Sequence, residues 1–266
     1  MNKVVLVTGA SSGIGKTTAQ YLIQKGFKVY GTSRNPKQNK LDFEMVTLDL
    51  NDVASIQNAV QFIIEKEGRI DILINNAGTG ITGPIEETPT EEIHKAFETN
   101  FFGVIEVMKA VLPQMRKQKS GLIINVTSIA GYMGLPFRGI YSATKSALER
   151  VTETIRMEVK KFGIEVTNIA PGDFATNIAA GRYHTPVFEN SVYKMVYQKN
   201  LDLMDAHVDS GGNPIEIAKK IYKIIENPNP KIHYKVGSFI EKFSIVLKQI
   251  LPNKIYEYLI TKHYKM

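Results

Sequence analysis

Three residues near the middle of the chain, Ser128, Tyr141 and Lys145, have types and a spacing that suit carbonyl chemistry. Tyr141 and Lys145 are four residues apart, so in a helix their side chains lie on one face. An ammonium stabilises a phenolate, which predicts that Lys145 lowers the pKa of the Tyr141 phenol and prepares it for proton transfer. Ser128 closes the strand-like run 122–127, where its hydroxyl can polarise a carbonyl. A Tyr-x-x-x-Lys pair alone is more often a solvated helix face, so the rest of the chain must supply the context.

A glycine-rich turn near the N-terminus is the first part of that context. The apolar run 4–7 predicts a buried strand, and residues 16–25 predict a helix that Gly26 ends. Glycines between them allow close approach to a pyrophosphate, and the helix N-terminus offers free N–H groups. A plain tight turn is the alternative, which the flanking elements disfavour. The predicted dinucleotide contacts at this turn are Gly9, Ser11, Ser12, Gly13, Ile14 and Gly15.

The end of the second predicted strand, 27–31, bears on the choice of cofactor. Folds selective for NAD usually place an acid here to hold the ribose 2′-hydroxyl. This chain has Ser33 and Arg34 instead. A guanidinium can bind a 2′-phosphate through several donors, so NADP(H) is the predicted cofactor, with NAD(H) possible. The alternative is that Arg34 is only a surface charge.

Strand-like and helical patterns alternate along most of the chain. We expect an α/β fold, a doubly wound parallel Rossmann sheet of about seven strands with helices on both faces, in a single domain over 1–266. Asn100, an amide inside the helical segment 90–117, is either bland or marks a local kink. The further strands are expected at 44–48, 70–74, 121–127, 164–169 and 231–236, and the further helices at 53–66, 141–162 and 214–226.

Two segments depart from this alternation. Residues 173–213 are long and rich in aromatic residues and methionine, which favours a lid over an apolar substrate, although such stripes more often belong to a core. Residues 238–264 predict two short amphipathic helices. Their apolar faces are expected to pack on the parent domain or a second subunit. The alternative is a membrane surface, with lysines at the headgroups. Those lysines are Lys242, Lys248, Lys254 and Lys262.

Composition excludes several classes of function. The chain has 266 residues and no cysteine, so it has no disulfide framework and no zinc–sulfur site; its five scattered histidines predict no metal site. The net charge is +7, of which residues 231–266, with seven lysines against two glutamates, carry +5. No nucleic-acid motif accompanies that charge. The N-terminus resembles no signal peptide and no apolar run reaches 18 residues, so a cytoplasmic protein is expected.

Taken together, the motifs resemble the short-chain dehydrogenase/reductase family over residues 3 to about 236. The resemblance implies a catalytic tetrad of Asn100, Ser128, Tyr141 and Lys145, with Lys145 also holding the cofactor ribose. It implies further cofactor contacts along the chain: Asp49 and Leu50 at the adenine, the Asn75–Gly78 motif with Asn76, Ala77 and Gly78, and Pro171, Gly172 and Thr176 at the nicotinamide carboxamide.

The implied activity is NADP(H)-dependent interconversion of a carbonyl and an alcohol on a small apolar substrate. The hydroxysteroid, retinol and lipid-carbonyl branches of the family are the most similar. Alternatives are an NAD-dependent alcohol dehydrogenase, a 3-oxoacyl reductase and a dinucleotide-binding protein without catalysis. The family analogy favours a homodimer or homotetramer.

Overall fold

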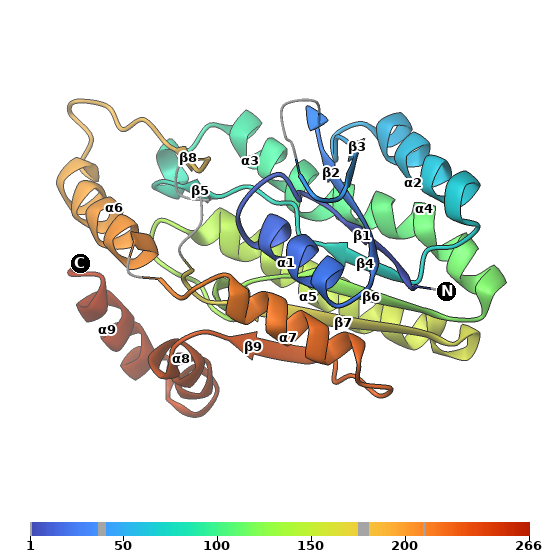
Figure 1. Ribbon diagram of the computed structural model, residues 1–266. Helices are drawn as coiled ribbons and strands as arrows, with labels where there is room; N and C mark the ends of the chain where they lie inside the picture. The colour runs from blue at the N-terminus through green and yellow to red at the C-terminus, as the bar shows by residue number, and fades with distance from the viewer. Residues whose placement is uncertain (1, 37–40, 175–180, 210) are drawn as a thin grey trace.

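The centre of the molecule is a parallel sheet of seven strands, as the sequence predicts. The computed structural model describes residues 2–36, 41–174, 181–209 and 211–266, without the side chains of 205 and 207–209. The strand order across the sheet is β3-β2-β1-β4-β6-β7-β9 (Figure 1). The chain adds β2 and β3 on one side of β1 and the later strands, from β4 on, on its other side. The strands are β1 (Val4–Val7), β2 (Lys28–Ser33), β3 (Glu44–Thr47), β4 (Ile72–Asn75), β6 (Gly121–Val126), β7 (Ile164–Pro171) and β9 (His233–Val236).

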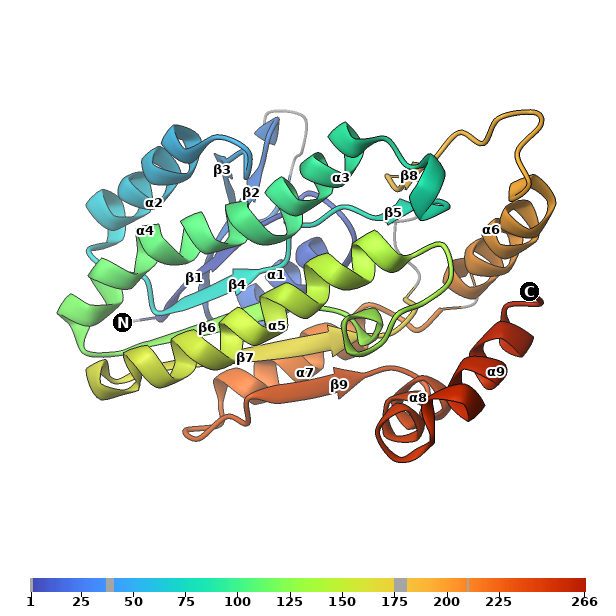
Figure 2. The same ribbon diagram turned by 180° about the vertical axis from the view of Figure 1, so that it is seen from behind.

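Helices cover both faces of this sheet (Figures 1 and 2). Successive strand residues face opposite sides, so Leu6 joins one core while Val5 and Val7 join the other. Both cores are apolar, which explains why the strands read as nearly continuous hydrophobic runs. The first core is covered by α2 (Val53–Glu67), α4 (Gly103–Gln118) and α5 (Gly139–Val159), and the second by α1 (Gly13–Gln24) and α7 (Ile215–Ile225).

Local signals set the start of α2 and the break before α4. Asp52 caps α2 by accepting hydrogen bonds from the backbone N–H groups of Ala54 and Ser55, at 2.9 and 3.2 Å. Between α3 (Thr90–Phe97) and α4, residues Glu98–Phe102 form a single π-helical turn that contains Asn100. The local kink at Asn100 is therefore present, and such turns are frequent at functional sites.

The segment 173–213 contains more regular structure than the sequence indicates. Strand β8 (Tyr183–His184) pairs in parallel with β5 (Ile81–Thr82), which follows the Asn75–Gly78 motif. Helix α6 (Lys194–Asp209) follows. Its inward residues are Tyr197, Asn200 and Met204, each 3% exposed or less. The role of this segment as a lid stays a prediction.

Two helices, α8 (Phe239–Ile250) and α9 (Asn253–His263), follow the last strand. Ser238 and Glu241 form a capping box at the start of α8. The side that packs on the domain carries Ile245 and Tyr256, which contact a third core that includes Ile129. The apolar face of α8 that includes Phe239 and Ile250 faces outward instead, with these side chains 75% and 67% exposed. The parent domain therefore does not cover this face. No helix in the described ranges is long and apolar enough to cross a membrane.

Candidate active site

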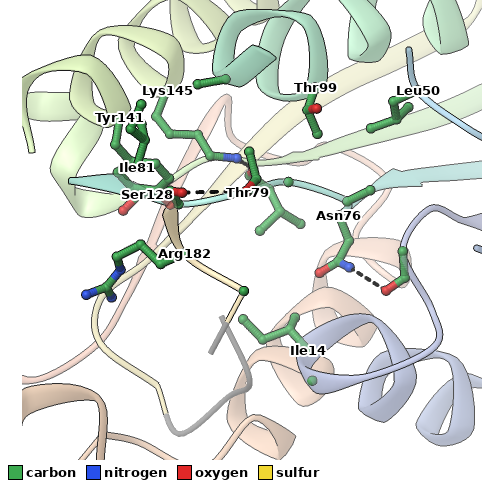
Figure 3. A pocket seen from close by; sticks show the side chains of 18 of the residues that line it. Ile14, Leu50, Asn76, Thr79, Ile81, Thr99, Ser128, Tyr141, Lys145 and Arg182 are labelled. Carbon is green, nitrogen blue, oxygen red and sulfur yellow. Dashed lines mark hydrogen bonds between the residues drawn. The ribbon is translucent and has the colours of Figure 1, made fainter. Parts of the chain in front are cut away.

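A cavity of about 630 Å³ opens at the carboxyl ends of the central strands, where the sheet order reverses (Figure 3). Parallel sheets place ligands at this edge because the loops that follow the strands diverge there. Its walls come from the glycine turn after β1, the end of β2, the Asn75–Gly78 motif after β4, Ser128 after β6 and the first turns of α5. Segments far apart in sequence therefore line one cavity.

Ser128, Tyr141 and Lys145 lie together in this cavity. The Ser128 hydroxyl accepts from the backbone N–H of Ala130 at 3.1 Å, and Ser128 is close enough to the phenol of Tyr141 to lower its pKa. Lys145 is 4% exposed, and its Nζ lies 5.9 Å from the centroid of the Tyr141 ring. That Nζ donates to the carbonyl oxygen of Val126 at 3.1 Å. Helix α5 thus presents both side chains beside the end of β6.

The pKa of Tyr141 shifts in the opposite direction to the sequence-based prediction. Burial raises the pKa of the Tyr141 phenol, because a phenolate loses its hydration in the cavity wall. Three neighbours act against burial by lowering the pKa of this phenol: Arg138, Ser128 and Arg182. Lys145 is not among them, and burial lowers its own pKa to about 8. Tyr141 is therefore a neutral phenol near pH 7, the form that donates a proton.

The cavity lining also includes two arginines, Arg138 and Arg182, that the sequence did not point to. The guanidinium carbon of Arg138 lies 5.9 Å from the centroid of the Tyr141 ring, and the same guanidinium lowers the pKa of Tyr264 near the C-terminus. Arg182 packs against Gly80, where an added Cβ would lie 3.0 Å from its Cγ. Arg138 lies three residues before Tyr141, and that spacing was the signal available in the sequence.

Asn100 is buried behind the cavity wall and is not part of its lining. Its Oδ1 accepts from the backbone N–H of Thr79 and its Nδ2 donates to the carbonyl of the same residue, both at 2.8 Å. Its Nδ2 also lies 3.3 Å from the hydroxyl of Thr144, next to Lys145. The side chain therefore fixes the segment after the Asn75–Gly78 motif against α5.

The glycine turn has the shape of a cradle for a dinucleotide. Gly9 and Gly13 have φ of +66° and +54°, a left-handed conformation that favours glycine. Gly15 lies under the carbonyl of Gly9, where an added Cβ would collide with it. The side-chain amide of Asn76 donates to the carbonyl of Gly9 at 3.2 Å, and its backbone N–H donates to the hydroxyl of Thr8 at 3.0 Å (Figure 3). The turn is thus held open at the N-terminus of α1.

The end of β2 also fits the nucleotide. The hydroxyl of Ser33 is buried and has no hydrogen-bond partner among the described residues, and Arg34 beside it is exposed at the cavity rim. A buried unpaired hydroxyl is costly unless a ligand or water satisfies it. On the neighbouring strand end, after β3, Asp49 accepts from the backbone N–H of Asn51 at 3.0 Å. These residues suit the adenosine end of a nicotinamide dinucleotide that carries a 2′-phosphate.

The structure brings together most of the residues predicted to contact the cofactor. Gly15 supports the turn from below, and Thr176 lies outside the described residues. The predicted residues that line the cavity are Gly9, Ser11, Ser12, Gly13, Ile14, Ser33, Arg34, Asp49, Leu50, Asn76, Ala77, Gly78, Ser128, Tyr141, Lys145, Pro171 and Gly172.

Comparison with known proteins agrees with this geometry. Residues 3–186 match the family model described as short chain dehydrogenase. The chain belongs to this family, whose members are oxidoreductases acting on CH–OH or carbonyl groups with a nicotinamide cofactor.

Among curated relatives, 3-ketodihydrosphingosine reductase of Bacteroides thetaiotaomicron is 40% identical over 257 residues, covering 96% of each chain. Dehydrogenase/reductase SDR family member 7B of Rattus norvegicus is 31% identical over 267 residues, covering 94% of this chain and 78% of the relative. A solved short-chain dehydrogenase from Streptomyces avermitilis superposes with a TM-score of 0.83 at 29% identity, covering 100% of this chain and 97% of the other. The NADP-bound structure of ElxO superposes with a TM-score of 0.72 at 28% identity, covering 89% and 97%.

Proposed function

We propose that this protein is an NADPH-dependent reductase that converts the ketone of a long-chain, largely apolar substrate into a secondary alcohol. The observation that carries the proposal is that Ser128, Tyr141 and Lys145 line one cavity wall, with the Tyr141 phenol kept neutral by burial. The 40% identity to 3-ketodihydrosphingosine reductase across nearly the whole of both chains favours a 3-keto sphingoid base as the substrate.

The protein's own residues would act on the carbonyl oxygen. Ser128 and Tyr141 would both bind that oxygen and polarise the carbonyl, and Tyr141 would give up its phenolic proton as negative charge develops there. Bound NADPH supplies the hydride, and the protein supplies position and electrostatics. Arg138 and Arg182 stabilise the phenolate that remains after proton transfer, because both lower the pKa of Tyr141. Lys145 would hold the ribose.

The choice of NADPH over NADH rests on Ser33 and Arg34. The Ser33 hydroxyl lacks a protein partner within the described ranges, and Arg34 adds an exposed guanidinium next to it. Both groups can donate to a 2′-phosphate, and the described residues of the turn after β2 place no carboxylate in the cavity lining that would repel it. The NADP-bound structure of ElxO supports the same choice.

Apolar residues beside the reacting groups support a lipid-like substrate. Ile81 and Phe174 line the cavity together with Tyr183 from β8. The segment 181–209 beyond them exposes Phe188, Val192 and Met195, at 68, 86 and 74%. Of these apolar residues, Ile81, Phe174 and Tyr183 lie in the lining that Ser128 and Tyr141 share.

The direct test is to incubate purified protein with 3-ketodihydrosphingosine and either NADPH or NADH. We expect loss of NADPH absorbance with formation of the 3-hydroxy product, and a much slower reaction with NADH. A 3-oxoacyl thioester with NADPH tests the 3-oxoacyl reductase activity. A long-chain alcohol with NADP⁺ or NAD⁺ tests the alcohol dehydrogenase activity. NADPH binding without turnover of any of these substrates would favour a dinucleotide-binding protein without catalysis.

A further inference from the structure

The C-terminal helix pair exposes an ordered apolar surface, which we call the outer face. Each member is at least 41% exposed, and the rings of Phe239 and Phe243 stack with centroids 5.5 Å apart. The outer face consists of Phe239, Ile240, Phe243, Val246 and Ile250 of α8 and Ile255, Tyr258 and Leu259 of α9.

Helical spacing explains why these side chains form one surface. Positions 239, 243, 246 and 250 recur every three or four residues and so form one stripe along α8. Ile245, which is 1% exposed, lies on the other side of the helix and packs on the domain. The inward side of α8 is thus already packed against the domain. An ordered cluster of this kind on a soluble surface is typical of an interaction site.

The charges beside the outer face are positive. Lys242, Lys254, Lys262 and Lys265 are exposed on the same two helices and the residues after them. Lys248 does not join them, in contrast to the sequence-based expectation, because its Nζ lies 5.0 Å from the centroid of the Tyr256 ring on the inward side.

The two acidic residues of these helices are turned away from the outer face. Glu241 accepts hydrogen bonds from the backbone N–H groups of Asp173 and Ser238, at 2.6 and 2.7 Å, so its charge is held against the domain. Glu257 follows Ile255 by two residues, which places it about 200° around α9. The outer face therefore presents aromatic and aliphatic side chains, and lysines lie at its edge.

We propose that the outer face docks the protein on the surface of an anionic lipid bilayer. Apolar side chains would enter the boundary between headgroups and acyl chains while the lysines pair with anionic headgroups. A second copy of the chain is a poorer fit, because two outer faces would bring lysines against lysines. The docked end of the molecule also carries α6 (Figures 1 and 2). Tyr264, just after α9, reaches Arg138 in the cavity wall, so the bilayer would lie near the site.

The test is co-sedimentation of the full chain with phosphatidylcholine vesicles that contain or lack phosphatidylglycerol. We expect binding only to the anionic vesicles at low salt, and its loss at about 1 M salt, where charges more than about 3 Å apart are screened. Phe239→Ser combined with Phe243→Ser should abolish binding while the thermal unfolding midpoint stays near that of the wild type, because both rings are exposed.

Phe62→Ser on α2 is the matched control for the aromatic change. Phe62 and Phe243 are each 43% exposed, and α2 lies at the opposite end of the molecule (Figures 1 and 2). This control should bind vesicles like the wild type. Equal loss of binding in Phe62→Ser would show a non-specific effect of removing surface phenylalanine, and would overturn the proposal.

A second set of variants tests the charges. Replacing Lys242, Lys254 and Lys262 together by glutamine should weaken binding about 100-fold, since each lysine near an anionic surface contributes roughly a factor of five. The control replaces three exposed lysines elsewhere and should change binding little: Lys117, Lys160 and Lys223.

Two further outcomes would refute docking on a bilayer. One is absence of vesicle binding by the full chain at low salt. The other is a dimer, seen by sedimentation velocity without lipid, that the Phe239→Ser and Phe243→Ser changes dissociate while vesicle binding is unaffected. That result would assign the outer face to a second copy of the chain.

Discussion

Arg138, three positions before Tyr141, lies close to Tyr264 after the last helix, and its guanidinium lowers the pKa of the Tyr264 phenol. Tyr264 is only 7% exposed, although it follows α9 near the C-terminus. The same guanidinium lies 5.9 Å from the ring of Tyr141, counted from its central carbon to the ring centroid. The electrostatics of the cavity therefore depend on a segment distant from it in sequence.

Arg138→Gln should move the alkaline limb of the pH–rate profile for reduction to higher pH. Reduction needs a neutral phenol at Tyr141, and Arg138 lowers the pKa of that phenol. Loss of one cation at this distance should move the limb by about one to two pH units. Tyr264→Phe is the control: it keeps the guanidinium charge and should leave the limb in place. An unmoved limb in Arg138→Gln would show that this charge does not act on Tyr141.

Tyr141→Phe should reduce kcat by about 10²- to 10⁴-fold, the usual contribution of general acid–base catalysis. The ring remains, so NADPH should still bind, which fluorescence titration would measure. Tyr183→Phe, in the same cavity lining, is the control and should retain activity. Wild-type turnover by Tyr141→Phe would rule out Tyr141 as the proton donor.

Arg34→Ala should weaken NADPH binding roughly 10- to 150-fold, because a charge-assisted hydrogen bond contributes about 1.5–3 kcal/mol. NADH has no 2′-phosphate and serves as the internal control, so its affinity should change little. Ser33→Asp should turn the preference toward NADH. Isothermal titration with both cofactors measures these ratios. Equal losses for the two cofactors would make Arg34 a structural residue.

Glu149→Gln should change how stability depends on pH. Glu149 is 1% exposed, accepts from the hydroxyl of Thr127 at 3.1 Å, and burial raises its pKa from 4.5 to about 7. The folded wild type therefore binds more protons than the unfolded chain between these values, and its stability falls as pH rises through that window. The shift corresponds to about 3 kcal/mol. The variant, which cannot ionise here, should gain in unfolding midpoint relative to the wild type as pH rises from 4.5 to 7.

The control for this measurement is Glu158→Gln, at an exposed position of the same helix. Its midpoint should follow that of the wild type at each pH. A pH-independent difference between Glu149→Gln and the wild type would mean that the buried carboxyl does not titrate in this window.

The central strands were predictable because they are buried on both faces and read as apolar runs, as in β1 and β4. The irregular turn at Asn100 was one of two alternatives that the sequence left open, and the structure has a π-helical turn there. Helix α6 was missed because its inward stripe of Tyr197, Asn200 and Met204 contains a polar residue that interrupts the apolar pattern.

The electrostatics of the site were not readable from spacing. The interval between Tyr141 and Lys145 predicts proximity, yet the Lys145 ammonium is bonded to the carbonyl of Val126, and burial decides the pKa of the phenol. Arg182 becomes a neighbour of Tyr141 only through the tertiary arrangement, whereas Arg138 is near it because it is the N-cap residue of the same helix, α5. The orientation of α8 was ambiguous for a similar reason, since apolar residues occur on both of its sides.

The capping box at the start of α8 also has a consequence for biosynthesis. The Glu241 carboxylate that caps α8 accepts the backbone N–H of Asp173, directly after Pro171 and Gly172. A ribosome delivers residues 1–236, which hold the whole sheet, before it delivers Glu241. On a nascent chain, the backbone of Asp173 therefore cannot bond to Glu241 until α8 has emerged. Emergence of α8, rather than formation of the sheet, sets the moment at which that wall of the cavity becomes fixed.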